Sequence, residues 1–309
     1  MEDFKIDQCI FSYLSHCKYE KGLSAQTLKA YQIDLKQFAE FIREKKSNPD
    51  KATLQLYIAN LHQQYKIKSE KRKIASLKAF FSYLEYEGKI EENPFAKLRI
   101  KLHEPFLLPR TIPLPIIHQL LACVYDRKNS MDDGCSYLYH EILRDIAILE
   151  LLFGTGMRVS ELCTLRPTSV DLTENTIKIC GKGAKERIIQ ICNENVWSAT
   201  NSYYEAYSQL IETSGWFFVN RLGHRLSEQS VRYMIRKYTE MACIKLHITP
   251  HMFRHSFATF LLEEDVDIRY IQHLLGHSSI MTTQIYTHVS SSKQREILAN
   301  RHPRNKLDV

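Results

Sequence analysis

Residues 105–115 read PFLLPRTIPLP and hold four of the nine prolines of the chain. Proline fixes the backbone angle φ and has no N–H to donate, so such a stretch stops helices and runs extended. It therefore predicts a linker between two domains. A chain of 309 residues is long enough for two domains that each bury a core. We expect one domain over residues 1–104 and a second over residues 116–309.

The region before the linker is expected to be a small, all-helical domain. No glycine occurs between Gly22 and Gly88, so this stretch can hold long helices. Two sets of apolar residues follow helical spacing, and the first is preceded by Ser24, a residue suited to cap a helix start. The sets are Leu28, Tyr31, Leu35, Phe38 and Ile42, then Ile74, Leu77, Phe81 and Leu84.

The region after the linker mixes helical periodicity with a β-hairpin. Two alternating runs flank a glycine-rich turn at residues 181–185, a pattern typical of an antiparallel hairpin. The expected elements are helices over 115–124 and 142–153, a polar loop over 126–134, strands over 176–180 and 186–191, a possible third strand over 216–219, and helices from residue 227 onward. The fold class is therefore mainly α with a small antiparallel β-sheet.

Composition excludes several protein classes. Apolar residues make up 44% and charged residues 25%, as in soluble globular proteins. No apolar run reaches the length of a membrane span, and the first residues lack an export signal, so we expect a cytoplasmic protein. The eight cysteines contain no C-x-x-C pair, so we expect them to be thiols, mostly buried, with no zinc or redox site.

The net charge of +7 is compatible with a polyanionic partner. Residues 1–104 carry +5 of it and the remainder +2, so the small domain is the more basic for its size. Four cations are expected on the outward side of its second helical set, either as a solvated face or as phosphate contacts. They are Lys71, Arg72, Lys73 and Lys78.

Residues 249–255, TPHMFRH, are expected to open a helix, with Thr249 as the cap and proline in the first turn. His251, Arg254 and His255 then lie near a helix N-terminus, where free amides favour an anion such as phosphate. A zinc-protease helix with the same histidine spacing needs Glu beside its first His, and Met252 stands there. We therefore expect no metal and no cofactor.

Four segments together resemble the conserved boxes of the tyrosine recombinases, the phage-integrase family, and most closely its Xer-type members. They are GTGMRVSEL at 154–162, GKGAKER at 181–187, HMFRH at 251–255 and LLGHSSIMTTQIYTH at 274–288. The resemblance covers nearly the whole chain. It implies a SAM-like core-binding domain over 1–104, the linker, and a catalytic domain of the DNA breaking–rejoining fold over 116–309.

The resemblance also implies roles for single residues. Tyr286 would attack the scissile phosphate, form a 3′-phosphotyrosyl bond and free a 5′-hydroxyl, which needs neither metal nor ATP. Arg158 and Arg254 would clamp the phosphate oxygens, since a guanidinium fork matches phosphate geometry. His251 would take part in proton transfer from the tyrosine, and His277 would hydrogen-bond the phosphate.

Three assignments leave alternatives open. Lys182 matches the lysine that would protonate the leaving 5′-oxygen, but Lys185 is also a candidate for this general acid. Lys185 and Arg187 are otherwise expected to contact DNA. Glu161 resembles the acid that orients the site, or else is a carboxylate on the helix surface that pairs locally.

The expected activity is site-specific recombination on double-stranded DNA with short core sites. Strand exchange would pass through a Holliday junction held by a homo- or hetero-tetramer, with no membrane partner. Chromosome or plasmid dimer resolution and mobile-element integration or excision both stay open, as does the role of a longer segment at 126–139. The alternatives are a type IB topoisomerase, a non-catalytic site-specific DNA-binding protein and, least favoured, a metal-dependent hydrolase.

Overall fold

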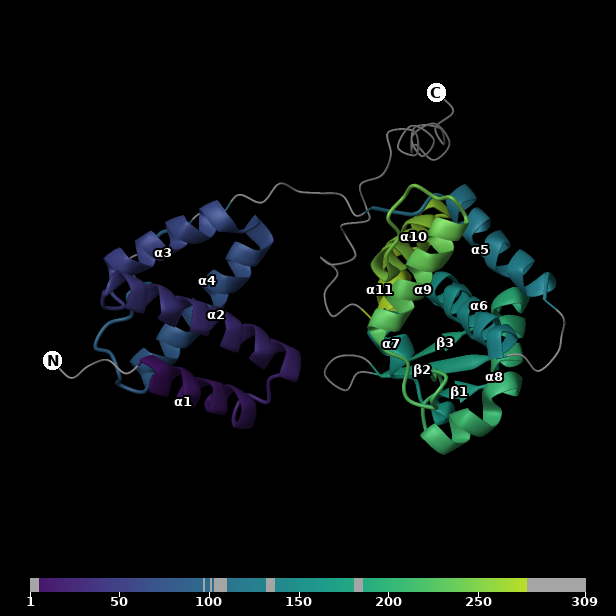
Figure 1. The fold of residues 1–309 in the computed structure, drawn as a ribbon, viewed down its shortest axis with the longest axis horizontal. Coiled ribbons are helices and arrows are strands. Elements are labelled where there is room, and N and C mark those ends of the chain that lie inside the picture. Colours follow the sequence, from purple (N-terminus) through teal and green to yellow (C-terminus); the bar gives the residue numbers. More distant parts are fainter. Residues whose placement is uncertain are drawn as a thin grey trace, which may run out of the picture. The chain divides into compact units, whose positions relative to one another are not determined.

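The computed structural model describes residues 6–96, 98–100, 102, 110–131, 137–180 and 186–276. The chain divides into two compact units, Met1–Phe106 and Leu107–Val309, each with its own buried core (Figure 1). No helix within the described ranges is long and apolar enough to cross a membrane.

In its described residues, the N-terminal unit is a bundle of four helices. They are α1 (Ile6–Tyr19), α2 (Ala25–Lys45), α3 (Lys51–Gln64) and α4 (Ile67–Tyr86). Both predicted helical sets are confirmed, and Ser24 caps α2 by accepting a hydrogen bond from the Thr27 N–H at 3.2 Å. Helix α4 packs against the other three helices, and aromatic side chains such as Tyr13, Phe38 and Phe80 fill the space between them.

The C-terminal unit is built around one apolar helix. Its elements are α5 (Leu114–Asn129), α6 (Tyr137–Thr155), α7 (Val159–Cys163), a 3₁₀ turn (Pro167–Ser169), β1 (Val170–Asp171), β2 (Thr176–Cys180), β3 (Glu186–Gln190), α8 (Glu194–Ser214), α9 (Glu228–Met241), α10 (Pro250–Glu263) and α11 (Ile268–Leu275). Helix α6 is contacted by α5, α7, α8, α9 and α10. Because most of α6 is buried, the segments that follow it are held against a rigid centre.

A three-stranded antiparallel sheet of order β1-β2-β3 lies beside these helices (Figure 1). The hairpin β2–β3 is confirmed, with Ile177 opposite Ile189 and Ile179 opposite Arg187. The predicted strand over 216–219 is wrong, because Val219 forms only an isolated bridge to Arg225 and β1 is the third strand instead. Phe217, Phe218 and Val219 in that run are nevertheless buried, which explains the misleading pattern.

Two further predictions are corrected. The polar run from Asp126 was expected to be a loop, but α5 continues through it to Asn129. Arg127 and Lys128 form its last turn, where cations favour a helix end. The cysteines within the described residues are free thiols, but Cys180, Cys192 and Cys243 are exposed rather than buried.

Candidate active site

Arg158 and Glu161 form the first part of the site, at the start of α7. Helix α6 ends at Thr155, and Gly156, with φ of 60°, turns the chain so that Arg158 becomes the N-cap of α7. Glu161 reaches back to this residue: Oε2 accepts from the Arg158 backbone N–H at 2.8 Å and Oε1 from its Nη1 at 2.7 Å. The Arg158 side chain stays 34% exposed, so its guanidinium is oriented but still accessible.

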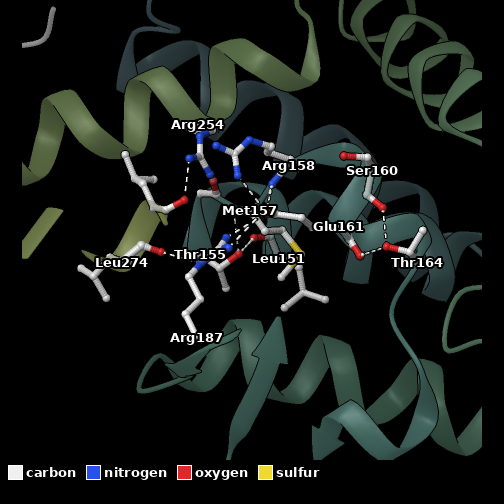
Figure 2. Close-up of polar contacts among 12 residues, drawn as sticks. Leu151, Thr155, Met157, Arg158, Ser160, Glu161, Thr164, Arg187, Arg254 and Leu274 are labelled. Atoms are coloured by element: carbon white, nitrogen blue, oxygen red, sulfur yellow. Dashed lines mark hydrogen bonds and ion pairs between the residues drawn. The ribbon is translucent and has the colours of Figure 1, made fainter. Parts of the chain in front are cut away.

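Arg187 on β3 supplies a second cation to the same carboxylate. Its Nη1 and Nη2 donate to Glu161 Oε1 and Oε2 at 3.1 and 2.8 Å, and its Nε donates to the Leu274 carbonyl at 2.9 Å. Burial alone would raise the pKa of Glu161. The hydrogen bonds from Arg187 and Arg158 outweigh it and lower that pKa below its ordinary value. Glu161 is therefore an ionised carboxylate between two guanidinium groups (Figure 2).

The position of Arg187 corrects a prediction. We expected it to contact DNA from the hairpin, but the side chain is only 6% exposed and its guanidinium is bonded to Glu161 and Leu274. Strand β3 alternates exposed and buried residues, with Arg187 and Ile189 on the buried side. The same alternation in the sequence was the signal that places this arginine inside.

Arg254 joins the site from α10. Pro250 occupies the first turn of that helix, and Arg254 lies one turn later with 4% exposure. Its Nη1 donates to the Gly156 carbonyl at 2.8 Å and its Nη2 to the Leu275 carbonyl at 2.6 Å. Figure 2 shows Arg254 and Arg158 side by side above Glu161, with Arg187 approaching from the sheet. Segments far apart in the sequence thus converge on one place.

The two histidines of α10 differ in environment. His251 is exposed and His255 half-buried. Partial desolvation and the nearby Arg254, Arg232 and Arg158 lower the pKa of His251. Burial, His251 and Arg254 lower the pKa of His255 to about 4. At neutral pH both imidazoles are therefore neutral, so His251 is ready to accept a proton.

Four predicted site residues lie outside the described residues: Lys182, Lys185, His277 and Tyr286. The structure does describe both flanks of the lysine segment and the residue before His277. Cys180 and Glu186 flank the lysine segment, and Gly276 directly precedes His277. A Cβ atom on Gly276 would lie 2.9 Å from Nη1 of Arg187, so the entry to the last segment packs tightly against the site.

The basic residues of α4 differ from the expected outward face. Lys78 is exposed and Lys71 half-buried, as an outward position allows. The prediction is wrong for Lys73, which is 2% exposed, bonds Asp34 and Gln37, and lies over the Tyr65 ring. Arg72 is exposed but pairs with Asp34 at 2.5 Å. Asp34, on the side of α2 that faces α4, forms ion pairs with both cations.

Within the residues that the structure describes, no group of three or more His, Cys, Asp and Glu side chains could hold a metal ion.

Comparisons with known proteins identify the family of the chain. The profile of the Phage integrase family matches residues 131–293, and that of the phage integrase N-terminal SAM-like domain matches residues 10–88. A tyrosine recombinase of Agathobacter rectalis is 51% identical and covers 96% of each chain. Tyrosine recombinase XerC of Oceanobacillus iheyensis is 35% identical over 97% of each chain.

Solved structures show the same fold. The XerA recombinase has a TM-score of 0.53 at 28% identity and covers 96% of this chain and 99% of its own. The XerH site-specific recombinase bound to palindromic difH substrate has a TM-score of 0.73 at 23% identity and covers 92% and 81%. The fold and the relatives define a site-specific recombinase. The chain belongs to the phage integrase family of tyrosine recombinases, and its relatives include Xer-type members.

His255 makes the stability of the C-terminal unit depend on pH. Its folded-state pKa of about 4 lies below the ordinary value of 6.5, so the unfolded chain binds more protons between these values. The contribution of His255 to the free energy of unfolding is fully present above about pH 6.5 and is lost as the pH falls toward 4. The free energy of unfolding, measured in urea, should therefore fall less between pH 7 and pH 4.5 in a His255→Asn variant than in the wild type. The exposed His224→Asn is the control, and an equal loss in all three proteins would contradict this prediction.

Proposed function

We propose that the chain cleaves and rejoins double-stranded DNA at short core sites through a 3′-phosphotyrosyl bond to Tyr286. The observation that carries the proposal is the convergence of Arg158 and Arg254 from separate segments onto one place. The described chain also leads directly from this place into the segments of Lys182 and Tyr286. Two fixed guanidinium groups match what stabilises the charge of a phosphodiester during its transfer.

The two arginines would bind the non-bridging oxygens of the scissile phosphate. Arg254 is buried and anchored by two carbonyls, and Arg158 is anchored by Glu161, so neither has to be ordered when DNA arrives. Such preorganised donors are worth about 10²–10³ each in rate where charge builds up in the transition state. The charge of Glu161 is offset by Arg187, so the site keeps a positive balance for the phosphate.

Proton transfer would complete the reaction. The Tyr286 hydroxyl oxygen attacks phosphorus while its proton passes to the neutral His251. The 5′-oxygen leaves and receives a proton from Lys182, or from Lys185 if that residue is the acid. His277 would hydrogen-bond the phosphate. Because the new bond is again a phosphodiester, the 5′-hydroxyl can reverse the step without metal or ATP.

The parts of the chain would divide the work. Residues 1–104 would bind the core site, residues 105–115 would link the domains, and residues 116–309 would carry out catalysis, with both domains closing around duplex DNA. Two core sites would be held by a homo- or hetero-tetramer that exchanges strands through a Holliday junction, in the cytoplasm. Support comes from solved structures of the same fold that contain DNA, such as XerH bound to difH substrate and a lambda integrase dimer bound to a COC' core site.

Covalent trapping tests the proposal. Fragmented genomic DNA of the source organism is incubated with the protein, adducts stable to detergent are isolated, and the attached DNA is sequenced to find the site. A nicked duplex of that sequence then accumulates the adduct, since the cut fragment diffuses away. Peptide mass spectrometry should place the linked nucleotide on Tyr286, with Tyr286→Phe as the negative control. An adduct on another residue, or one formed by Tyr286→Phe, would disprove the assignment.

Plasmid assays separate the proposal from its alternatives. A recombinase should exchange strands only between plasmids that carry the recovered site. Relaxation of supercoils in a plasmid without that site would indicate a topoisomerase. Sequence-specific binding without any adduct would indicate a non-catalytic DNA-binding protein.

Lys78 offers a test of DNA contact by the N-terminal unit. A Lys78→Gln variant should bind the recovered site more weakly and reduce the slope of log K against log[salt] by about one, because one phosphate contact and its counterion are lost. The measurement is fluorescence anisotropy at four salt concentrations. Lys51→Gln, which removes the same charge from α3, should leave the slope unchanged. A slope change of equal size in both variants would contradict a specific contact by Lys78.

A further inference from the structure

Arg187 has bonds that no assigned role uses. Its three donor nitrogens contact two separate parts of the site: Nη1 and Nη2 bind the Glu161 carboxylate, and Nε binds the Leu274 carbonyl. Glu161 in turn fixes Arg158 through a backbone and a side-chain bond. Leu274 lies in the last turn of α11, two residues before Gly276. One side chain therefore joins the sheet, the start of α7 and the end of α11.

These bonds are of a strong kind. A guanidinium with a carboxylate in a bidentate arrangement is among the strongest hydrogen-bonded pairs in proteins, and both partners here are buried. Packing adds to the constraint, since Gly276 leaves no room for a side chain beside the Arg187 guanidinium. Removal of one partner would leave the other charge buried with fewer partners, so the arrangement has little freedom to shift.

We propose that Arg187 is a positioning residue that orients Arg158 through Glu161 and fixes the chain at the start of β3 and at the end of α11. Strand β3 starts at Glu186, directly after the lysine segment 181–185, so a fixed Arg187 also fixes where that segment rejoins the sheet. The bond to Leu274 does the same for the chain that leads to His277. The inference rests on the proposed function and adds a residue that touches no phosphate.

The first experiment measures cleavage and binding separately. Single-turnover cleavage of the nicked substrate and its Kd are compared for the wild type, Arg187→Gln and Arg187→Lys. Arg187→Gln should cleave on the order of 10–100-fold more slowly, the range seen when a group that orients a reacting side chain is lost. Its Kd should change by less than about twofold, because binding is spread over many phosphates and the proposal gives Arg187 a contact with none of them. Arg187→Lys should recover part of the rate, since it keeps the charge beside Glu161 but not the fork.

A matched control lies on the same hairpin. Lys178 and Glu186 form an exposed ion pair at 2.7 Å on β2 and β3. Lys178→Gln removes one positive charge from the hairpin without touching Glu161, so its cleavage rate should equal that of the wild type. If it slows cleavage as much as Arg187→Gln, the effect comes from hairpin charge and the inference is overturned.

A double-mutant cycle identifies the route of the effect. If Arg187 acts on Arg158 through Glu161, then Arg187→Gln together with Glu161→Gln should cleave no more slowly than the slower single variant. Rate losses that multiply would show that the two residues act independently. Equal cleavage by Arg187→Gln and the wild type, or a Kd that weakens by the same factor as the rate, would also overturn the inference.

A measurement without DNA distinguishes failure of the inference from failure of the proposed function. Arg187 provides the largest of the effects that lower the pKa of Glu161, so carbon NMR of that carboxyl should show a higher pKa in Arg187→Gln. Lys178→Gln should leave it unchanged. If the wild type forms no adduct on any DNA, the proposed function fails, and this titration still decides whether Arg187 governs Glu161. An unshifted pKa overturns the inference even if the wild type cleaves.

Discussion

Arg254→Ala is expected to lower the single-turnover rate of DNA cleavage by about 10³-fold or more, because loss of one donor to developing charge already costs about 10²–10³. The side chain is 4% exposed and donates to the carbonyls of Gly156 and Leu275. The variant therefore removes the proposed phosphate donor and also leaves two carbonyls without this partner. Binding is spread over many phosphates, so the Kd should change far less. Cleavage of the nicked substrate at saturating DNA measures the effect.

Two further variants show what property of Arg254 matters. Arg254→Lys keeps the charge but cannot bond both carbonyls with one planar fork, so we expect it to stay well below the wild-type rate. Arg236→Ala is the control for lost charge, since Arg236 is 72% exposed and pairs with Glu240 in its own helix. Cleavage by Arg254→Ala within about tenfold of the wild type would contradict a direct role in the clamp.

Much of the fold was predictable because its signals are local. Ser24 at a helix start and a glycine-rich turn between alternating runs depend on residues within a few positions of one another. The structure confirms α2 and the β2–β3 hairpin on these signals. The segment around Arg158 and the helix of Arg254 could likewise be placed, since their order and spacing resemble a known family.

Partners across the chain were not predictable. Periodicity predicts which side of a helix a residue occupies, but it does not predict which charged residue of a neighbouring element it will contact. Lys73 was expected on the outward side of its helix, yet Asp34, far away in the sequence, bonds its ammonium group and offsets the cost of burying that charge. Arg187 shows the reverse. The alternation along β3 places its side chain on the buried side, whereas we expected it to contact DNA.

Burial without pairing explains the failed strand. Phe217, Phe218 and Val219 are all buried, so their run has the apolar character of a strand in a core. Tyr203 meets their backbone instead, accepting from the Val219 N–H at 3.1 Å and donating to the Phe217 carbonyl at 2.8 Å. Backbone groups in this segment are thus bonded to a side chain from α8, which a sequence pattern does not reveal.

Gly156→Ala is expected to destabilise the C-terminal unit by about 2–5 kcal/mol, from two separate causes. Gly156 has φ of 60°, a left-handed conformation that a Cβ atom disfavours. A Cβ there would lie 2.5 Å from Cδ1 of Phe257 and 3.0 Å from Cδ2 of Leu275, inside the distance that packed atoms allow. The carbonyl of Gly156 holds Arg254, so relief of the clash by a shift of the chain should also slow cleavage.

Tryptophan fluorescence during urea unfolding measures this loss in the right part of the chain. Both tryptophans, Trp197 and Trp216, lie in the C-terminal unit, so the signal does not report the N-terminal one. Gly223→Ala is the matched control: its φ of 72° imposes the same conformational cost, but its Cβ would meet only Cδ2 of Leu210 at an ordinary 3.5 Å. It should therefore lose only about 1–2 kcal/mol. Equal losses in the two variants would show that Phe257 and Leu275 can move aside, and the close packing between α6 and α10 would then not hold Arg254 in place.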